Sequence, residues 1–376
     1  MRNKTLPNQA RPNQGRRHDR LPLQKCFGLF TAGTLLCTLL GACGQSSTNS
    51  FDAAKSASKT GFYLDTVITV SIYGTDNEEY IDDCFTLADQ YENMFSNTIE
   101  TSEISLINAS AGSGEYTTVS DETLELLNAG ISYAQLSDGA FDITVGTLSD
   151  LWGISEIADS LTTSDKAVDE SYLPTDEEIA QALATVDYTA IEINGNEVRL
   201  NHPDARIDLG SIAKGYIADQ MKTCLEEKGV QYGLINLGGN VLTIGTKVDG
   251  NGWNIGLQKP FDETGLSMAA IRVEDKSVVT SGIYERYFTV DDVIYHHILD
   301  LTTGYPCRNN LYAVTIISDS SMDGDALSTT CFVLGMEKGM ELIESLDGVD
   351  ALFITDDLTI HKTSGIDSNY TLTILE

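Results

Sequence analysis

Two oxygen-bearing side chains in residues 325–330 (DALSTT) have the spacing of a metal-binding pair. Asp325 and Thr329 are four residues apart, and on a helix this spacing places both side chains on one face. A carboxylate and a hydroxyl are hard oxygen ligands, which suit Mg²⁺ when water and a substrate phosphate complete its coordination. We expect this carboxylate to be accessible from the surface. Alternatively, Asp325 only complements the helix dipole and Thr329 only fills the core.

A second candidate site lies in residues 207–216 (IDLGSIAKGY). We expect a strand at residues 206–209, which contains Asp208, and a helix that begins at Ser211. The free N–H groups and the positive dipole end of a helix start attract anions. Lys214 lies one turn further on the same face and would add a full positive charge. The pattern therefore indicates an anion site. Alternatively, Ser211 is only a helix cap and Lys214 a solvated surface residue.

Two of the five histidines, His296 and His297, adjoin at the end of an expected strand. Neighbouring residues of a strand face opposite sides, so one ring could enter a cleft as a proton carrier or phosphate donor while the other is structural. Alternatively, both rings lie on an exposed edge. A further turn with close backbone approach is expected at residues 236–240 (NLGGN), although paired glycines alone are a weak signal.

The elements that must position these residues form an α+β pattern. An alternating run at residues 67–73 predicts a first strand, and apolar spacing at residues 77–96 predicts a helix after it. Asn194 and Gly195 between two alternating runs predict a hairpin, and Thr175 with Glu178 predicts a capping box. No internal repeat or second linker is visible. We therefore expect one mixed α+β domain over residues 61–376.

The chain has 376 residues and a net charge of −33, which argues against binding to nucleic acid. Residues 1–42 differ from the remainder, because they carry seven basic residues and one acidic residue. Their basic part precedes an apolar run at residues 26–41, and this order is typical of a secretory signal. The apolar run is too short for a comfortable membrane span. Residues 43–60 are expected to be a flexible tether.

The apolar run closes with the sequence Leu-Gly-Ala-Cys, which ends at Cys43 and resembles the lipobox of bacterial lipoproteins. Lipidation of Cys43 would place two acyl chains in a bilayer, and each buried methylene contributes about 0.8 kcal/mol. This predicts a protein anchored to a cell membrane on its extracytoplasmic face. Alternatively, Cys43 is a chance cysteine in an ordinary signal peptide.

The cysteines beyond Cys43 indicate neither a zinc site nor a redox motif, because none of them forms a C-x-x-C pair. An exported compartment would allow one disulfide. Cys84, Cys224 and Cys331 each lie on the apolar side of a helix-like pattern, which favours buried thiols at least as strongly. The four cysteines beyond Cys43 are Cys84, Cys224, Cys307 and Cys331.

Together the motifs resemble the ApbE family of FAD:protein FMN transferases from about Phe62 to the C-terminal strands. The resemblance rests on the order of residues 137–146, 151–153, 207–216, 236–240, 280–286, 296–306 and 325–329. It implies a single α+β domain that binds FAD and Mg²⁺ outside the cytoplasm. It also implies that FMN is moved from FAD onto a threonine of an acceptor protein, with release of AMP. The expected acceptor is an exported or membrane redox protein.

The resemblance also implies roles for particular residues. Expected FAD contacts are Leu64, Ala140, Phe141, Asp142, Asp208, Lys214 and Ile298. Expected Mg²⁺ ligands are Ser211, Asp325, Thr329 and, through its backbone, Ser328. The sequence departs from the family at Leu64-Asp65-Thr66, where Met-Gly-Thr is usual.

The expected chemistry is phosphoryl transfer, in which Mg²⁺, Lys214 and the start of the helix at Ser211 stabilise negative charge. A threonine hydroxyl is a poor nucleophile, so a general base would help by roughly 10²–10⁴-fold. His297 is the first candidate for this base and Asp208 the second. Two other functions stay open: a Mg²⁺-dependent FAD pyrophosphatase that makes FMN and AMP, and a lipid-anchored flavin-binding protein or electron carrier without catalysis.

Overall fold

An eight-stranded sheet runs through the part of the chain that the computed structural model describes, which is residues 52–161, 166–262 and 264–375. Every pair of neighbouring strands in it is antiparallel. In their order across the sheet, the strands are β1 (Ser56–Tyr63), β2 (Thr66–Tyr73), β6 (Tyr232–Leu237), β7 (Asn240–Ile244), β10 (Ser277–Gly282), β13 (Leu311–Ser318), β14 (Asp350–Thr355) and β15 (Ile360–Lys362).

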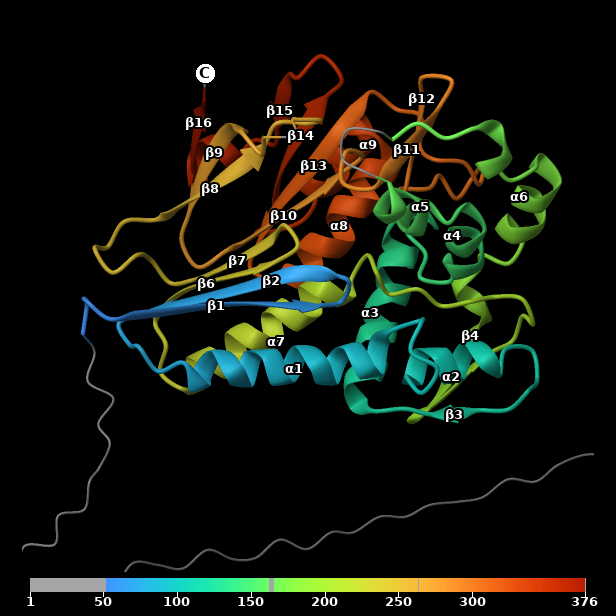
Figure 1. The fold of residues 1–376 in the computed structure, drawn as a ribbon, viewed down its shortest axis with the longest axis horizontal. Coiled ribbons are helices and arrows are strands. Elements are labelled where there is room, and N and C mark those ends of the chain that lie inside the picture. Colours follow the sequence, from blue (N-terminus) through green and yellow to red (C-terminus); the bar gives the residue numbers. More distant parts are fainter. Residues whose placement is uncertain (1–51, 162–165, 263, 376) are drawn as a thin grey trace, which may run out of the picture. The chain divides into compact units, whose positions relative to one another are not determined.

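Three smaller antiparallel sheets surround this sheet (Figure 1). One contains three strands in the order β16 (Thr371–Ile374), β9 (Ser267–Val273) and β8 (Trp253–Gln258). Another has the order β3 (Thr117–Thr118), β5 (Glu197–Leu200) and β4 (Ile191–Asn194). The third is the hairpin of β11 (Tyr287–Val290) and β12 (Val293–His296).

The helices of the described residues vary from one turn to almost five turns in length. They are α1 (Glu79–Phe95), α2 (Glu103–Ala109), α3 (Asp121–Leu136), α4 (Gly146–Trp152), α5 (Ile154–Ser160), α6 (Asp176–Leu183), α7 (Ala213–Glu227), α8 (Ser321–Leu334), α9 (Met336–Glu344) and α10 (Gly365–Asn369). Two short 3-10 helices occupy Glu170–Tyr172 and Tyr188–Ala190.

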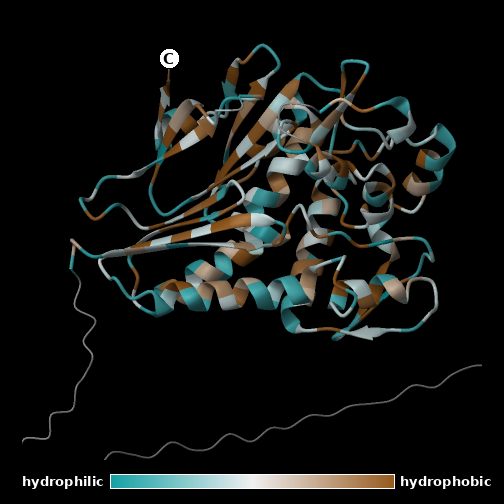
Figure 2. Ribbon diagram, in the orientation of Figure 1, coloured by the Kyte–Doolittle hydropathy of each residue, from teal (hydrophilic) through white to brown (hydrophobic). Residues whose placement is uncertain are grey.

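The helices α7 and α8 pack side by side against the large sheet, with α7 on β6 and β7 and α8 on β10 and β13. Helix α1 packs on α7 and lies with it on the same side of β1 and β2 (Figure 1). The main core fills the space between these layers, and its members include the fully buried residues Ile68, Ile72, Ile217 and Met221. Figure 2 shows hydrophobic positions, in brown, along the strands of the sheet.

The opposite face of the large sheet is covered by the sheet of β8, β9 and β16. Trp253 and Leu257 of β8 pack there with Val278 of β10 and Ile317 of β13. Both faces of the central strands are therefore buried, which explains why β13 and β14 consist almost entirely of buried residues. This arrangement leaves the ends of the strands and of α7 and α8 free to form a site.

Several sequence predictions are confirmed. The α+β class is correct, and the helix predicted at residues 77–96 is α1. The predicted hairpin is formed by β4 and β5, with Asn194 paired to Glu197. The capping box at Thr175 is present at the start of α6, because the Thr175 side chain accepts a hydrogen bond from the Glu178 N–H and the Glu178 carboxylate accepts one from the Thr175 N–H.

Two predictions of local structure are wrong. The predicted tether at residues 43–60 includes the start of β1, because Ser56 pairs with Tyr73 and a full antiparallel ladder follows. Residues 206–209 are not a strand, since only Arg206 forms an isolated bridge, to Val145. The Ile207 backbone bonds instead to both ends of the Asn108 amide, at 2.7 and 3.0 Å. The other edge of this segment bonds to the backbone of Ile143 and Gly146, so a side chain and a short backbone bridge take the place of a regular strand pairing.

The predicted signal segment at residues 1–42 and the lipidation site Cys43 lie outside the described residues. Within the described ranges, no helix combines the length and the apolar composition needed to cross a bilayer. The cysteines Cys84, Cys224, Cys307 and Cys331 carry free thiols, and all except Cys224 are buried.

Candidate active site

A cavity of about 200 Å³ lies where α7, α8 and the loop before α4 meet, and it contains most of the predicted site residues. The loop supplies three of them, the start of α7 supplies another group, and α8 supplies the predicted metal pair. The predicted residues that line this cavity are Ala140, Phe141, Asp142, Asp208, Ser211, Lys214, His297, Ile298, Asp325 and Thr329.

A second cavity of about 230 Å³ adjoins the first, and the two share Asp208, Lys214, Arg286 and His297 in their walls. The predicted residue Leu64 lines this second cavity. Because the walls are shared, the two cavities together offer one larger site, with the two basic side chains where they adjoin. Such a site suits a long ligand with negative charge near its centre.

Leu64 lies in a tight turn that the sequence did not reveal. Leu64 and Asp65 join the antiparallel strands β1 and β2 and have φ values of 54° and 53°. A two-residue hairpin loop with both residues in the left-handed region matches the twist of the strands, although leucine rarely adopts this conformation. The Leu64 N–H donates to Glu92 Oε1 at 3.1 Å, which ties the turn to α1.

The Asp142 carboxylate organises the loop that lines the cavity. Its Oδ1 accepts hydrogen bonds from the Thr144 N–H at 2.8 Å and the Thr144 hydroxyl at 2.7 Å. Its Oδ2 accepts one from the Tyr188 N–H at 2.9 Å. Burial raises the pKa of Asp142, and these donors oppose that effect. Both oxygens are therefore engaged within the protein, so Asp142 shapes the cavity wall.

The start of α7 differs from the prediction in one respect. The helix begins at Ala213 and its cap position is Ile212, so Ser211 lies in the preceding turn and does not cap the helix. Ser211 still lines the cavity. Asp208 forms the base of this turn, because its Oδ1 accepts a hydrogen bond from the Gly210 N–H at 2.8 Å.

Lys214 extends from the first turn of α7 into the cavity wall. Its Nζ donates to the Gly210 carbonyl at 2.9 Å and lies 3.7 Å from Asp325 Oδ1. The lysine side chain is 28% exposed. Lys214 is therefore held at the site by two partners and is not a freely solvated surface residue.

The predicted metal pair lies on one face of α8, as its spacing implied. Asp325 is 4% exposed, so the expected surface accessibility is wrong. Its Oδ2 accepts a hydrogen bond from the Gly215 N–H at 3.0 Å. The Thr329 hydroxyl lies 3.3 Å from Ser281 Oγ. Asp325 is buried because α8 packs against α7 at this point, where the Gly215 N–H contacts the carboxylate.

Ser328 does not line either cavity, in contrast to the other predicted metal ligands. It is fully buried, and its hydroxyl bonds to Ser281 Oγ at 2.8 Å and donates to the Asp325 carbonyl at 3.0 Å. A residue next to Thr329 on a helix points about 100° away from it, which turns Ser328 toward the sheet. The Ser328 hydroxyl is therefore engaged within the protein, and ligation through the Ser328 backbone stays a prediction.

The remaining donor set fits a hard cation that is bound incompletely by protein. Asp325 supplies a carboxylate, and Thr329 and Ser211 supply hydroxyls to the same cavity. Across the described ranges, no group of three or more His, Cys, Asp or Glu side chains is placed to hold a metal ion. Oxygen donors with several open positions suit Mg²⁺, which usually keeps water and phosphate ligands.

The two histidines face opposite sides, as predicted. His296 is 4% exposed, and its Nε2 lies 3.0 Å from the Cys307 carbonyl, so this ring is structural. His297 lines both cavities, and its Nδ1 lies 3.2 Å from the Arg286 carbonyl. Burial, assisted by the Arg286 charge, lowers the pKa of His297 to about 3. In the neutral ring Nδ1 must donate to that carbonyl, so Nε2 carries the free lone pair.

Comparison with known proteins decides the family. Residues 64–353 match the ApbE family. The chain is 32% identical to a FAD:protein FMN transferase of Treponema pallidum, over 89% of this chain and 93% of the relative. The chain belongs to the ApbE family. A FAD:protein FMN transferase of Klebsiella pneumoniae is 35% identical over 79% of this chain and 88% of its own length.

Solved structures of ApbE proteins share the fold. The flavin transferase ApbE from Vibrio cholerae aligns with a TM-score of 0.73 and 27% identity, over 84% of this chain and 99% of the other. An ApbE protein from Thermotoga maritima also aligns with a TM-score of 0.73, at 30% identity and the same coverage.

In this ApbE domain, sequence reasoning missed two residues that line the first cavity, Glu285 and Arg286. Both lie within the motif at residues 280–286 that was already singled out, but no spacing rule assigned them a role. Glu285 is exposed at the cavity wall, and partial loss of hydration there raises the pKa of its carboxyl group. The neighbouring charges of Lys214 and Arg286 oppose that rise.

Proposed function

We propose that this chain is a FAD:protein FMN transferase, which moves FMN from FAD onto a threonine of an acceptor protein and releases AMP. The observation that carries the proposal is the position of Lys214 and Arg286 in the walls shared by two adjoining cavities. FAD is a long molecule with two negative charges on a central pyrophosphate. Two basic side chains where the two cavities adjoin match that charge, and the names of the ApbE relatives agree with this substrate.

The reaction joins the threonine oxygen to the FMN phosphorus and breaks the bond between that phosphorus and the oxygen of AMP. Negative charge spreads over the phosphoryl oxygens in the transition state, so fixed positive charge accelerates the reaction. Lys214 and Arg286 supply part of this charge. Their guanidinium and ammonium groups also hold the pyrophosphate in place while the acceptor approaches.

Asp325, Thr329 and Ser211 would hold Mg²⁺ in this site. When bound, Mg²⁺ neutralises phosphate charge and polarises the phosphoryl group. Among these three residues Asp325 alone carries a carboxylate, so the remaining coordination positions are open to water and to substrate oxygens. The buried position of Asp325 fixes the direction of its carboxylate through the Gly215 N–H.

His297 is the first candidate for the group that takes the proton of the threonine hydroxyl. Its Nε2 carries a lone pair at neutral pH, because the pKa of the ring is lowered to about 3. The neutral ring is thus able to accept a proton from the threonine hydroxyl as the oxygen attacks phosphorus. Asp208 is the second candidate, because it lines both cavities and uses Oδ1 in the turn at Gly210.

The experiment that tests this function supplies the purified protein with FAD, Mg²⁺ and an acceptor protein that contains the target threonine. The acceptor is then weighed by mass spectrometry, and AMP is measured by chromatography. A mass gain of one FMN together with AMP supports the transferase. AMP and free FMN with an unmodified acceptor would show a FAD pyrophosphatase, and neither product would show a flavin-binding protein or electron carrier.

We also propose that Cys43 is lipidated and that the ApbE domain acts on the extracytoplasmic face of a cell membrane. The support comes from the sequence: a basic segment, an apolar run and a lipobox-like end precede Cys43. The folded part begins shortly after, with β1 at Ser56. An exported or membrane redox protein is the acceptor expected in that location.

A further inference from the structure

Helices α7 and α8 touch backbone to backbone beside the proposed metal site. A Cβ atom added to Gly215 would lie 2.2 Å from the Ser321 carbonyl oxygen and 2.6 Å from Met322 Cα. Only glycine leaves room for such an approach. The first turn of α7 therefore rests directly on the first turn of α8.

Each helix caps the other at this contact. Asp325 of α8 accepts a hydrogen bond from the Gly215 N–H, in the first turn of α7, at 3.0 Å. Asp219, one turn further along α7, accepts hydrogen bonds from two N–H groups in the first turn of α8, those of Ser321 at 2.8 Å and Met322 at 3.0 Å. The N–H groups of a first turn lack partners within their own helix, so a carboxylate from the neighbouring helix satisfies them.

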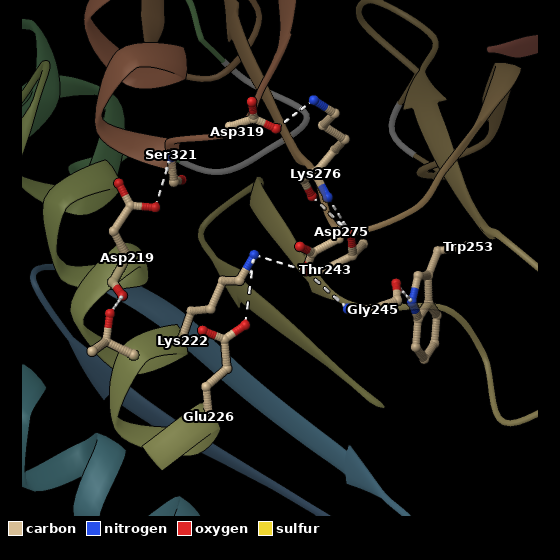
Figure 3. A network of polar contacts seen from close by, with 11 residues as sticks. Asp219, Lys222, Glu226, Thr243, Gly245, Trp253, Asp275, Lys276, Asp319 and Ser321 are labelled. Carbon is tan, nitrogen blue, oxygen red and sulfur yellow. Dashed lines mark hydrogen bonds and ion pairs between the residues drawn. The ribbon is translucent and has the colours of Figure 1, made fainter. Parts of the chain in front are cut away.

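Asp219 has a third donor in the same place, because the Ser320 hydroxyl donates to its Oδ2 at 2.8 Å. Figure 3 shows Asp219 reaching from α7 toward Ser321 at the start of α8. Asp219 does not line either cavity. It therefore has no direct contact with a ligand in the site, and any effect on the site must be indirect.

We propose that Asp219 is a positioning residue for the metal site. By holding the start of α8 against α7, it fixes where Asp325 lies relative to Lys214 and Gly215. If Asp219 is removed, three donors at the start of α8 lose their partner and the helix can slide or tilt at the Gly215 contact. The Asp325 carboxylate then loses its fixed direction. This inference rests on the proposed function, in which Asp325 binds Mg²⁺.

The test measures metal binding without turnover. Mn²⁺ replaces Mg²⁺, and its free concentration is followed by electron paramagnetic resonance while the purified full-length protein is titrated without FAD. We expect Asp219→Ala to raise the Kd for Mn²⁺ by about 10- to 100-fold, the range seen when groups that orient metal ligands are removed. Asp219→Asn keeps the volume but has only one acceptor oxygen, so we expect a smaller rise.

A matched control separates positioning from general loss of stability. Asp350 of β14 is a buried carboxylate that, like Asp219, is held by hydrogen bonds; it accepts them from the Thr363 hydroxyl at 2.9 Å and the Asn369 amide at 3.2 Å. It lies on neither α7 nor α8. Asp350→Ala should lower the melting temperature yet keep the wild-type Kd for Mn²⁺. A Kd within twofold of wild type in folded Asp219→Ala, or an equal rise in Asp350→Ala, would overturn the inference.

Failure of the proposed metal site gives a different result. If the wild-type protein binds no Mn²⁺, or if Asp325→Ala binds it as tightly as wild type, the metal assignment is wrong and the inference falls with it. If Asp325→Ala loses binding while Asp219→Ala keeps it, the metal site stands and only the role of Asp219 is wrong.

Discussion

Lys214 and Asp325 form an ion pair between α7 and α8, with 3.7 Å between Nζ and Oδ1. The carboxylate is almost buried, and its other oxygen is bonded to the Gly215 N–H. A cation that binds Asp325 must therefore share Oδ1 with the Lys214 ammonium or displace it. Asp325, the proposed metal ligand, and Lys214, the proposed phosphate-binding residue, are therefore directly paired with each other. Replacing Asp325 should therefore affect the metal-assisted reaction, whereas replacing Lys214 should affect the binding of FAD.

The first prediction concerns Asp325. Asp325→Ala should lower kcat/KM for FAD by at least about 100-fold, because stabilisation of a phosphoryl oxygen by a metal contributes several kcal/mol. The measurement is AMP release at saturating and at low Mg²⁺. The matched control is Asp323→Ala, which removes a carboxylate of the same helix that bonds to the Tyr133 hydroxyl outside the cavities. Equal activity of Asp325→Ala and wild type at low Mg²⁺ would refute the assignment.

The order of the elements could be predicted from the sequence better than their contacts. The spacing of Asp325 and Thr329 correctly placed two side chains on one helix face, and alternation correctly separated His296 from His297. These inferences depend only on the period of one element. The burial of Asp325 could not be predicted, because it depends on Gly215, more than one hundred residues earlier in the chain.

The same limit explains the other errors. The segment at residues 206–209 has a strand-like composition, yet its backbone bonds to the side chain of Asn108. Residues 56–60 are polar and resemble a linker, yet they pair with β2 at the edge of the sheet, where polar side chains are tolerated. In each case a contact outside the segment decides its structure: the neighbouring hairpin strand for residues 56–60 and the distant Asn108 side chain for residue 207. Local periodicity carries no information about that partner.

The second prediction concerns the charge of Lys214. Lys214→Met keeps most of the side-chain volume and removes the ammonium, so FAD should bind about 10- to 100-fold more weakly, the range for losing a hydrogen bond to a charged group. The Kd is measured by quenching of flavin fluorescence. Lys222→Met is the control, because Lys222 lies on the same helix and pairs with Asp275 at 2.8 Å away from the cavities (Figure 3). Unchanged FAD affinity in Lys214→Met would show that this lysine binds no phosphate.

The third prediction is a pH dependence. The pKa of His297 is lowered to about 3 by burial, so the ring stays neutral and able to accept a proton throughout pH 5–8. His297 should therefore add no titration step near the ordinary histidine pKa of about 6.5 to the pH profile of activity between pH 7 and pH 5. His297→Ala should lower kcat by about 10²–10⁴-fold at every pH in this range. A wild-type profile with a limb near pH 6.5 that disappears in His297→Ala would contradict the lowered pKa.

The same shift affects stability with a defined sign. Below pH 6.5 the unfolded chain binds a proton at residue 297, whereas the folded chain does not until about pH 3. The unfolded state therefore gains protons first, and the free energy of unfolding falls as the pH decreases across this window. His296 adds to the effect, because burial lowers its pKa to about 4. Denaturation midpoints at pH 7 and pH 5 should differ less in His297→Ala than in wild type.

The fourth prediction concerns the membrane anchor. Cys43→Ser removes the thiol that would receive the diacylglyceryl group, so radiolabelled fatty acid should be incorporated into wild type and not into the variant. Two acyl chains bury many methylenes at about 0.8 kcal/mol each, so wild type should sediment with membranes even at high salt. The net charge of −33 gives no electrostatic attraction to anionic lipids, which leaves the acyl chains as the main source of affinity. Cys224→Ser, in the folded domain, is the control and should still be labelled. Equal labelling of wild type and Cys43→Ser, or labelling of neither, would disprove lipidation at Cys43 while leaving the transferase proposal untouched.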